Sequence, residues 1–264
     1  MRSSLGITMA NEPRTLRLAV LIDADNASSR IAPGLFEEIA KIGEASVRRI
    51  YGDFSGTRNK SWADILSKHA IMPHQNFAYT TGKNASDIAL VIDAMDLLHS
   101  GRFDGFCLVS SDSDFTRLAA RIREQGVDVY GFGERKTPES FRQACRRFVY
   151  TENLLPAVPA TDQPEPSATP APAVKPPSAA TPLIRTAIQQ IDDEDGWVPL
   201  GRVGQQLTIL ASDFDTRTYG QSKLVDLVKK AGAFEIRRDE GRDVYLRVKP
   251  AGEESSPAKA KAAS

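Results

Sequence analysis

Aspartate residues occur at three places in the first half of the chain where an apolar segment ends or a helix begins. Asp23 directly follows an apolar run at 18–22, and Asp112 and Asp114 follow a second run at 105–110. Asp87 opens a long amphipathic segment that leads into that second run. Carboxylates that converge without a basic partner repel one another, and a divalent cation removes that repulsion. Hard oxygen ligands suit Mg²⁺ or Mn²⁺, which can activate water and stabilise charge on a phosphodiester.

Each aspartate taken singly has a simpler interpretation. Asp87 and Asp114 could each be a helix N-cap, and Asp23 could be a turn residue after a strand. Two acidic groups at two strand ends favour the metal site, because ligands of an open parallel sheet sit beyond the carboxyl ends of the strands. Asp93 follows Asp87 by six residues on the same helix, about 120° around its axis. We therefore interpret Asp93 as a candidate supporting residue and not as a ligand.

Short apolar segments alternate with amphipathic ones from residue 16 to about 152, and this order predicts the elements that position the acids. Strands are predicted at 18–22, 46–51, 105–110 and 127–132, with a shorter one that begins at residue 70. Helices are predicted at 33–42, 60–69, 85–98 and 114–125. Continuous apolar strands that alternate with helices indicate an α/β fold with a parallel sheet covered on both faces.

The composition disfavours several classes of protein. Lys and Arg total 34 and Asp and Glu total 34, which argues against binding of nucleic acid through bulk charge but not against a local basic groove. Cys107 lies in an apolar run and is interpreted as a buried, inert thiol. No stretch approaches the roughly 20 apolar residues that span a bilayer, and the N-terminus lacks the apolar region of a secretory signal. These features predict a cytoplasmic protein without a membrane partner.

A second domain follows a change in composition. Residues 153–181 are rich in Pro, Ala, Thr and Ser, and such a segment buries too little apolar surface to offset its ordering entropy, which predicts a linker. Residues 182–248 predict helices at 183–191, 200–210 and 219–231, then a hairpin that pairs 234–238 with 243–248. This is the plan of a small winged-helix α+β domain. The two ends of the chain, 1–15 and 249–264, are predicted to be disordered.

The acidic segments of the first domain resemble the motifs of NYN domains, a PIN-like nuclease group that includes LabA-type proteins. The segments are Asp23-Ala24-Asp25-Asn26, Lys83-Asn84-Ala85-Ser86-Asp87 and Ser110-Ser111-Asp112-Ser113-Asp114-Phe115. The resemblance covers 16–152 and implies a Rossmann-like sheet and hydrolysis of RNA at a Mg²⁺ or Mn²⁺ site. By match, the catalytic and metal-binding acids are Asp23, Asp87, Asp112 and Asp114, which together we call the acidic site. Asn26 would orient a phosphate or a ligand carboxylate.

Basic residues of the same domain are candidates for contact with RNA. Lys83 could bind a phosphate near the scissile bond, with a solvated loop lysine as the alternative. Arg58 and Lys60 could line a groove, whereas Trp62 is interpreted as a core residue. A basic segment at 135–147 forms either a solvated face or a patch that tracks the RNA backbone. Its cations are Arg135, Lys136, Arg142, Arg146 and Arg147.

The second domain resembles OST-HTH domains, also called LOTUS domains, over residues 182–248. The resemblance is carried by Gly196-Trp197-Val198-Pro199-Leu200 and by the segment Asp213-Phe214-Asp215-Thr216-Arg217-Thr218-Tyr219-Gly220. It implies binding of RNA or, in some relatives, of a protein partner. Arg217 and Lys223 are candidate phosphate contacts. The aromatic side chains of Trp197, Phe214 and Tyr219 are interpreted as core.

The leading hypothesis is a metal-dependent endoribonuclease whose tethered RNA-binding domain raises the local concentration of RNA. One alternative is a non-catalytic RNA-binding adaptor in which the acids hold a structural ion or none. Another is a phosphatase of the HAD type, because Asp23-Ala24-Asp25 after a first strand is similar to its nucleophile motif. Asn26 and the winged-helix partner disfavour this last alternative.

Overall fold

The computed structural model describes residues 14–76, 84–155, 174–191, 196–239 and 243–249. The chain divides into two compact units, with the boundary between residues 162 and 163, and each unit is described by itself. Most of the predicted linker and chain ends lie outside the described residues. Within the described segments, no helix combines the length and apolar character that crossing a membrane requires.

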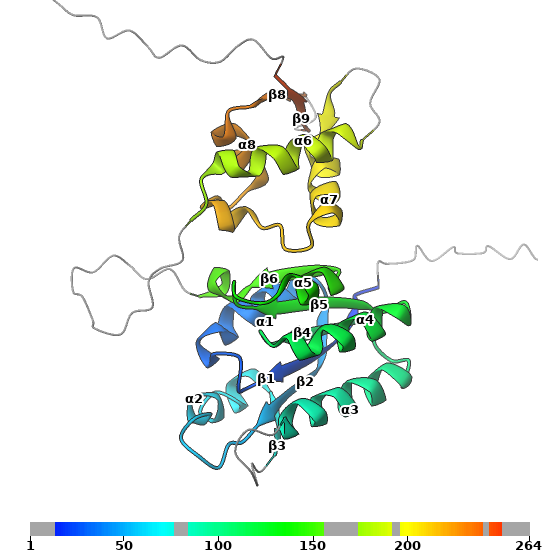
Figure 1. Cartoon of the computed structure of the whole chain (residues 1–264), viewed down its shortest axis with the longest axis vertical. Helices are drawn as coiled ribbons and strands as arrows, with labels where there is room; N and C mark the ends of the chain where they lie inside the picture. The colour runs from blue at the N-terminus through cyan, green and yellow to red at the C-terminus, as the bar shows by residue number, and fades with distance from the viewer. Residues whose placement is uncertain (1–13, 77–83, 156–173, 192–195, 240–242, 250–264) are drawn as a thin grey trace, which may run out of the picture. The chain divides into compact units, whose positions relative to one another are not determined.

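The first unit is built on a six-stranded parallel sheet (Figure 1). Its strands are β1 (Arg17–Asp23), β2 (Glu44–Gly52), β3 (Met72–Gln75), β4 (Gly105–Val109), β5 (Asp128–Gly133) and β6 (Arg147–Tyr150). The order across the sheet is β3-β2-β1-β4-β5-β6, with every neighbouring pair parallel. The direction of the order reverses between β1 and β4, and ligands of such sheets bind at this switch point. The predicted Rossmann-like α/β fold is confirmed.

Helices cover both faces of this sheet. One apolar core contains side chains of α1 (Ala32–Ala40) and α2 (Lys60–Ala63), and the other contains side chains of α3 (Ala85–His99), α4 (Thr116–Glu124) and α5 (Glu139–Ala144). β1 contributes to both, because Leu21 packs in the α3 core while Val20 and Ile22 pack in the α1 core. Burial on both faces explains why this strand is apolar at every position from Leu18 to Ile22. Short 3₁₀ helices in the loops include η1 (Ser29–Ile31), η3 (Ser113–Phe115) and η4 (Thr151–Leu154).

The observed elements differ from the predicted ones in two places in this unit. The helix predicted at 60–69 is divided into α2 and the 3₁₀ helix η2 (Ser67–His69). Trp62 is the buried residue of α2, so little apolar surface supports a longer helix, and Ala70 ends the segment with a left-handed φ of 50°. The sequence pattern does not predict α5 or β6, because both are short and lie in or beside the basic segment at 135–147.

The second unit combines three helices with a three-stranded antiparallel sheet, which confirms the predicted small α+β domain. Its helices are α6 (Thr181–Gln189), α7 (Leu200–Leu210) and α8 (Leu224–Ala231), with 3₁₀ helices η5 (Pro177–Ala180) and η6 (Thr216–Tyr219). The sheet order is β7 (Val198–Pro199), β9 (Val244–Val248), β8 (Phe234–Arg238), so β7 adds a strand to the predicted hairpin. The helix predicted at 219–231 begins only at Leu224, because Gly220 ends η6 with φ 68°.

Candidate active site

Asp23 is the buried centre of the acidic site, at the carboxyl end of β1. Its side chain is only 1% exposed. Its Oδ2 accepts hydrogen bonds from Ser110 Oγ at 2.7 Å and from Asn26 Nδ2 at 2.9 Å, and its Oδ1 accepts from the backbone N–H of Asp25 at 3.0 Å. Burial raises the pKa of this carboxyl above its usual value, while the hydrogen bonds act in the opposite direction. These contacts fix the orientation of the carboxylate.

Ser110 connects the acids at the ends of β1 and β4. Its hydroxyl donates to Asp23, and the same oxygen accepts a hydrogen bond from the backbone N–H of Asp112 at 3.0 Å. Asp112 is the N-cap of η3, where its Oδ1 accepts from the backbone N–H of Asp114 at 2.9 Å. Sequence reasoning did not select Ser110, although its place directly after β4 was the available signal. The two acidic segments are therefore joined through one buried hydroxyl.

Asp87 reaches the same place from the first turn of α3. Burial, followed by repulsion from neighbouring carboxylates, raises the pKa of Asp87 to about 6. The carboxylates responsible come from both strand ends: Asp23, Asp112, Asp25 and Asp114. Asp87 is not the N-cap of its helix, because that position is occupied by Asn84. Asp87 thus interacts electrostatically with the other three acids of the predicted site, although these residues are far apart in sequence.

The chemistry of these donors fits a divalent cation. All are carboxylate oxygens, the ligand type preferred by Mg²⁺ and Mn²⁺, and their mutual repulsion is the feature that such a cation relieves. Within the segments that the structure describes, no three His, Cys, Asp or Glu side chains lie close enough together to hold a metal ion. The acids therefore lie in one region and have the oxygen ligands that these cations prefer, but their side chains are farther apart than the ligands of one bound ion.

Asp93 lies in a different cluster on α3. Its Oδ2 accepts hydrogen bonds from Tyr51 Oη at 2.6 Å and from Arg49 Nη1 at 2.7 Å, and His74 Nδ1 is 3.6 Å away. Burial acts to raise the pKa of Asp93, but these partners outweigh it and lower the pKa overall. The cluster attaches α3 to β2 and β3, so Asp93 supports the helix that carries Asp87.

We expect Asp93→Asn to lower the free energy of unfolding by about 1 to 3 kcal/mol at pH 7, because Arg49 and Tyr51 lose a charged acceptor. The folded-state pKa of Asp93 is lowered, so its contribution is present above the unfolded-state value and is lost as the pH falls through the folded-state value. Urea denaturation at pH 7 and at pH 3 measures this, with the exposed Asp96→Asn on the same helix as control. Equal stability of wild type and Asp93→Asn at pH 7 would contradict the structural role.

Family models identify both units. A model described as the NYN domain matches residues 17–154, more than half of the chain. The chain belongs to the NYN domain family. A second model, described as the OST-HTH/LOTUS domain, matches residues 175–245. Both predicted resemblances are confirmed, and NYN domains are part of the PIN-like nuclease group.

Solved structures resemble parts of the chain only weakly. A protein of unknown function from Vibrio parahaemolyticus is 20% identical with a TM-score of 0.44, and the match covers 54% of this chain and 96% of that one. An uncharacterized protein from Nitrosomonas europaea is 30% identical with a TM-score of 0.27, and the match covers 37% and 95%. MurG of Acinetobacter baumannii is 10% identical with a TM-score of 0.35, and the match covers 81% and 69%. No curated protein matches.

The residues of the NYN domain that were considered as RNA contacts differ in exposure and in whether an acid already pairs with them. Lys83 lies outside the described residues, so its role stays a prediction. Trp62 is 1% exposed, which confirms that it is a core residue. The cations of the basic segment do not form a free patch, because several of them pair with acids. These pairs are Arg147 with Glu38, Arg146 with Asp128, and Lys136 with Glu134.

In the OST-HTH domain, the predicted phosphate contacts differ in availability. Arg217 donates from Nε and Nη2 to Asp215 Oδ2, at 2.9 and 2.6 Å, so a phosphate would have to compete with this carboxylate. Lys223 is exposed at the N-cap of α8. Whether either residue contacts RNA stays a prediction.

Trp197 is not a core residue, and the prediction that placed it there is wrong. The guanidinium groups of Arg237 and Arg247 each lie 4.8 Å from the centre of its ring. Side chains alternate along a strand, so the buried Val198 in β7 leaves Trp197 on the outer face. Arg237 also lies 5.5 Å from the ring of Tyr245, which adds a further cation–π contact. Phe214 and Tyr219 do pack against the core of the domain, as predicted.

Proposed function

We propose that this protein is a metal-dependent endoribonuclease that hydrolyses phosphodiester bonds in RNA and holds its substrate with a tethered RNA-binding domain. The observation that carries the proposal is the convergence of four acids from β1, α3 and the loop after β4 at the switch point of the sheet. Repulsion among them contributes to the raised pKa of Asp87, about 6. Membership of the NYN domain family supports a hydrolase that acts on nucleic acid.

Each residue of the acidic site would have a distinct role in this reaction. A bound Mg²⁺ or Mn²⁺ ion would supply an activated water and offset charge on the phosphodiester. Asp23 is the most firmly oriented acid, since Ser110 and Asn26 both donate to it. Asp87 would hold the ion from α3, and Asp112 and Asp114 from the loop after β4. Asn26, which donates to Asp23, would orient a ligand carboxylate or a phosphate.

The test is cleavage of a circular single-stranded RNA by the full chain, with Mg²⁺ or Mn²⁺ and after their removal by a chelator. A circle has no ends, so cutting it demonstrates endonuclease activity. We expect metal-dependent linearisation that the chelator stops. RNA that is bound but never cut, with either metal, would overturn the enzyme and favour the non-catalytic RNA-binding adaptor.

We further propose that the OST-HTH domain contacts RNA through the outer face of its sheet. Arg237 and Arg247 both make cation–π contacts with Trp197 there. Guanidinium planes can stack on unpaired bases and donate hydrogen bonds to phosphates. The match to the OST-HTH/LOTUS domain supports RNA as the ligand. Binding of a protein partner is the alternative.

We expect Trp197→Ala to weaken binding of single-stranded RNA about tenfold, because the aromatic surface is lost together with its contact to Arg237, while Arg247 keeps its ion pair with Glu235. Fluorescence anisotropy on the full chain measures the affinity, with Asp112→Asn in every sample to prevent cleavage. Ile209→Ala, at an exposed apolar residue of α7, is the matched control. Unchanged affinity in Trp197→Ala would exclude this face as the RNA contact.

A further inference from the structure

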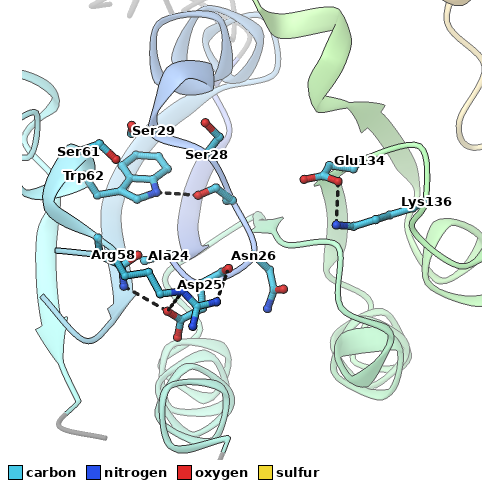
Figure 2. Close-up of a pocket in the computed structure, with 12 residues that line it drawn as sticks. Ala24, Asp25, Asn26, Ser28, Ser29, Arg58, Ser61, Trp62, Glu134 and Lys136 are labelled. Atoms are coloured by element: carbon cyan, nitrogen blue, oxygen red, sulfur yellow. Dashed lines mark hydrogen bonds and ion pairs between the residues drawn. The ribbon is translucent and has the colours of Figure 1, made fainter. Parts of the chain in front are cut away.

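A polar pocket opens directly beside the acidic site, at the end of β1 (Figure 2). Its volume is about 340 Å³. The loop after β1 forms one part of the lining, α2 and the residues before it form another, and the loop after β5 forms the third. Its lining includes the cations Arg58 and Lys136, the acids Asp25 and Glu134, and the hydroxyl groups of Ser29 and Ser61. The pocket is therefore assembled from three segments that are distant in sequence.

Buried side chains hold the wall of this pocket in place. Trp62 Nε1 donates to the backbone carbonyl of Ala27 at 2.8 Å. Asn59 is 3% exposed, and its Nδ2 donates to Asp25 Oδ1 and to the backbone carbonyl of Asp53, each at 3.1 Å. Two of these three bonds attach the loop after β1 to α2 and to the residue that precedes α2, and the third attaches that residue to the segment after β2. The pocket is preformed, so a ligand would not have to order it.

Two cations lie on different sides of the opening (Figure 2). Arg58 Nε is 3.8 Å from Asp25 Oδ1, and Lys136 Nζ is 2.9 Å from Glu134 Oε2. The side chains of Arg58 and Lys136 are 75% and 71% exposed. Exposed ion pairs of this kind contribute at most about 1 kcal/mol, so an anionic ligand can replace the acid as partner. The hydroxyl groups of Ser29 and Ser61 add uncharged donors and acceptors between the two cations.

Asn26 belongs to both the pocket and the acidic site. It lines the pocket, while its Nδ2 donates to Asp23 at 2.9 Å. A ligand at the acidic site would therefore lie next to the pocket. Small-molecule pockets range from about 300 to 1,000 Å³, so the observed volume suits one nucleotide.

We propose that this pocket is a subsite for one nucleotide of the substrate, next to the phosphodiester bound at the acidic site. This inference rests on the proposed function and adds the path of the RNA strand across the end of the sheet. Arg58 and Lys136 bind the phosphate of that nucleotide, and Ser29 and Ser61 bind its sugar hydroxyls or base edge. The pocket thereby fixes which bond of the strand lies at the acidic site.

The test is photocrosslinking of a short RNA that contains one 4-thiouridine to the full chain, followed by mass spectrometry of the peptides. Asp112→Asn is present in every sample, so the assay does not depend on cleavage. We expect crosslinks within 24–29 or 58–62, reduced about fivefold or more in Arg58→Gln/Lys136→Gln, because the double variant removes both charges that hold the phosphate. Lys68→Gln is the matched control, since Lys68 is an exposed cation of η2 that does not line the pocket.

Crosslinks that map elsewhere in the chain, or that are as abundant in the double variant as in the control, would overturn the subsite. A second readout uses cleavage without Asp112→Asn. There the double variant should raise KM about tenfold and change kcat by less than about twofold, because binding is lost without loss of the acids. If no RNA is cleaved by wild type, the proposed function fails, while the crosslink positions still decide the pocket.

Discussion

Replacing Asp112 by asparagine is expected to lower kcat for RNA cleavage by about a thousandfold or more. Asparagine has nearly the same size as aspartate, and its amide oxygen can still accept the hydrogen bond from the backbone N–H of Asp114 that caps η3. The substitution therefore removes a negative charge from the acidic site and leaves the local structure in place. Single-turnover cleavage at saturating Mn²⁺ measures the rate.

Two controls separate this effect from misfolding. Asp96→Asn removes a carboxylate from an exposed position of α3 and should cleave at the wild-type rate. Binding of RNA by Asp112→Asn should match that of wild type to within about threefold, because most of the affinity comes from contacts to the phosphate backbone. A wild-type cleavage rate in Asp112→Asn would remove this residue from the site.

Asp87→Asn is expected to stabilise the metal-free protein. The pKa of Asp87 in the folded state, about 6, is higher than its ordinary value of 3.8, so the ionised carboxylate disfavours the folded state. This penalty is complete above pH 6 and is relieved as the pH falls toward 4. After allowance for solvent screening, its removal should raise the free energy of unfolding by on the order of 1 to 2 kcal/mol at pH 8.

Thermal denaturation in the presence of a chelator measures this change. Asp87→Asn should melt several degrees above wild type at pH 8, in line with the size of the free-energy change, and the two should converge near pH 4. Asp96→Asn provides the baseline for loss of a carboxylate on the same helix. If Asp87→Asn melts at or below the wild-type temperature at pH 8, burial and neighbouring carboxylates do not disfavour the ionised Asp87 in the folded state.

The sequence was sufficient to place the acids because of a rule of topology. Asp23 and Asp112 each follow an apolar strand, and the carboxyl ends of parallel strands lie on one edge of a sheet. The topology rule alone does not place Asp87, because its position depends on how α3 packs. The resemblance to the motifs of NYN domains supplied that information. The helical period also separated Asp93 from the site correctly, because its partners Tyr51 and Arg49 lie on β2.

The contacts that hold the site could not be predicted in the same way. Ser110 and Asp23 are 87 residues apart, and Asn59 and Asp25 are 34 residues apart. Nothing in the local pattern of a hydroxyl or amide specifies such a distant partner. Trp197 shows a related difficulty, because β7 is only two residues long and gives no alternation from which the inner and outer faces could be assigned.

Calorimetric titration of the full chain with Mn²⁺, compared between wild type and Asp87→Asn, tests most directly whether these acids share a cation. We expect saturable binding by wild type and an affinity at least about tenfold lower in Asp87→Asn, because one of the charged oxygen ligands is lost. Equal affinity in the two proteins, or no binding by wild type at millimolar Mn²⁺, would contradict it.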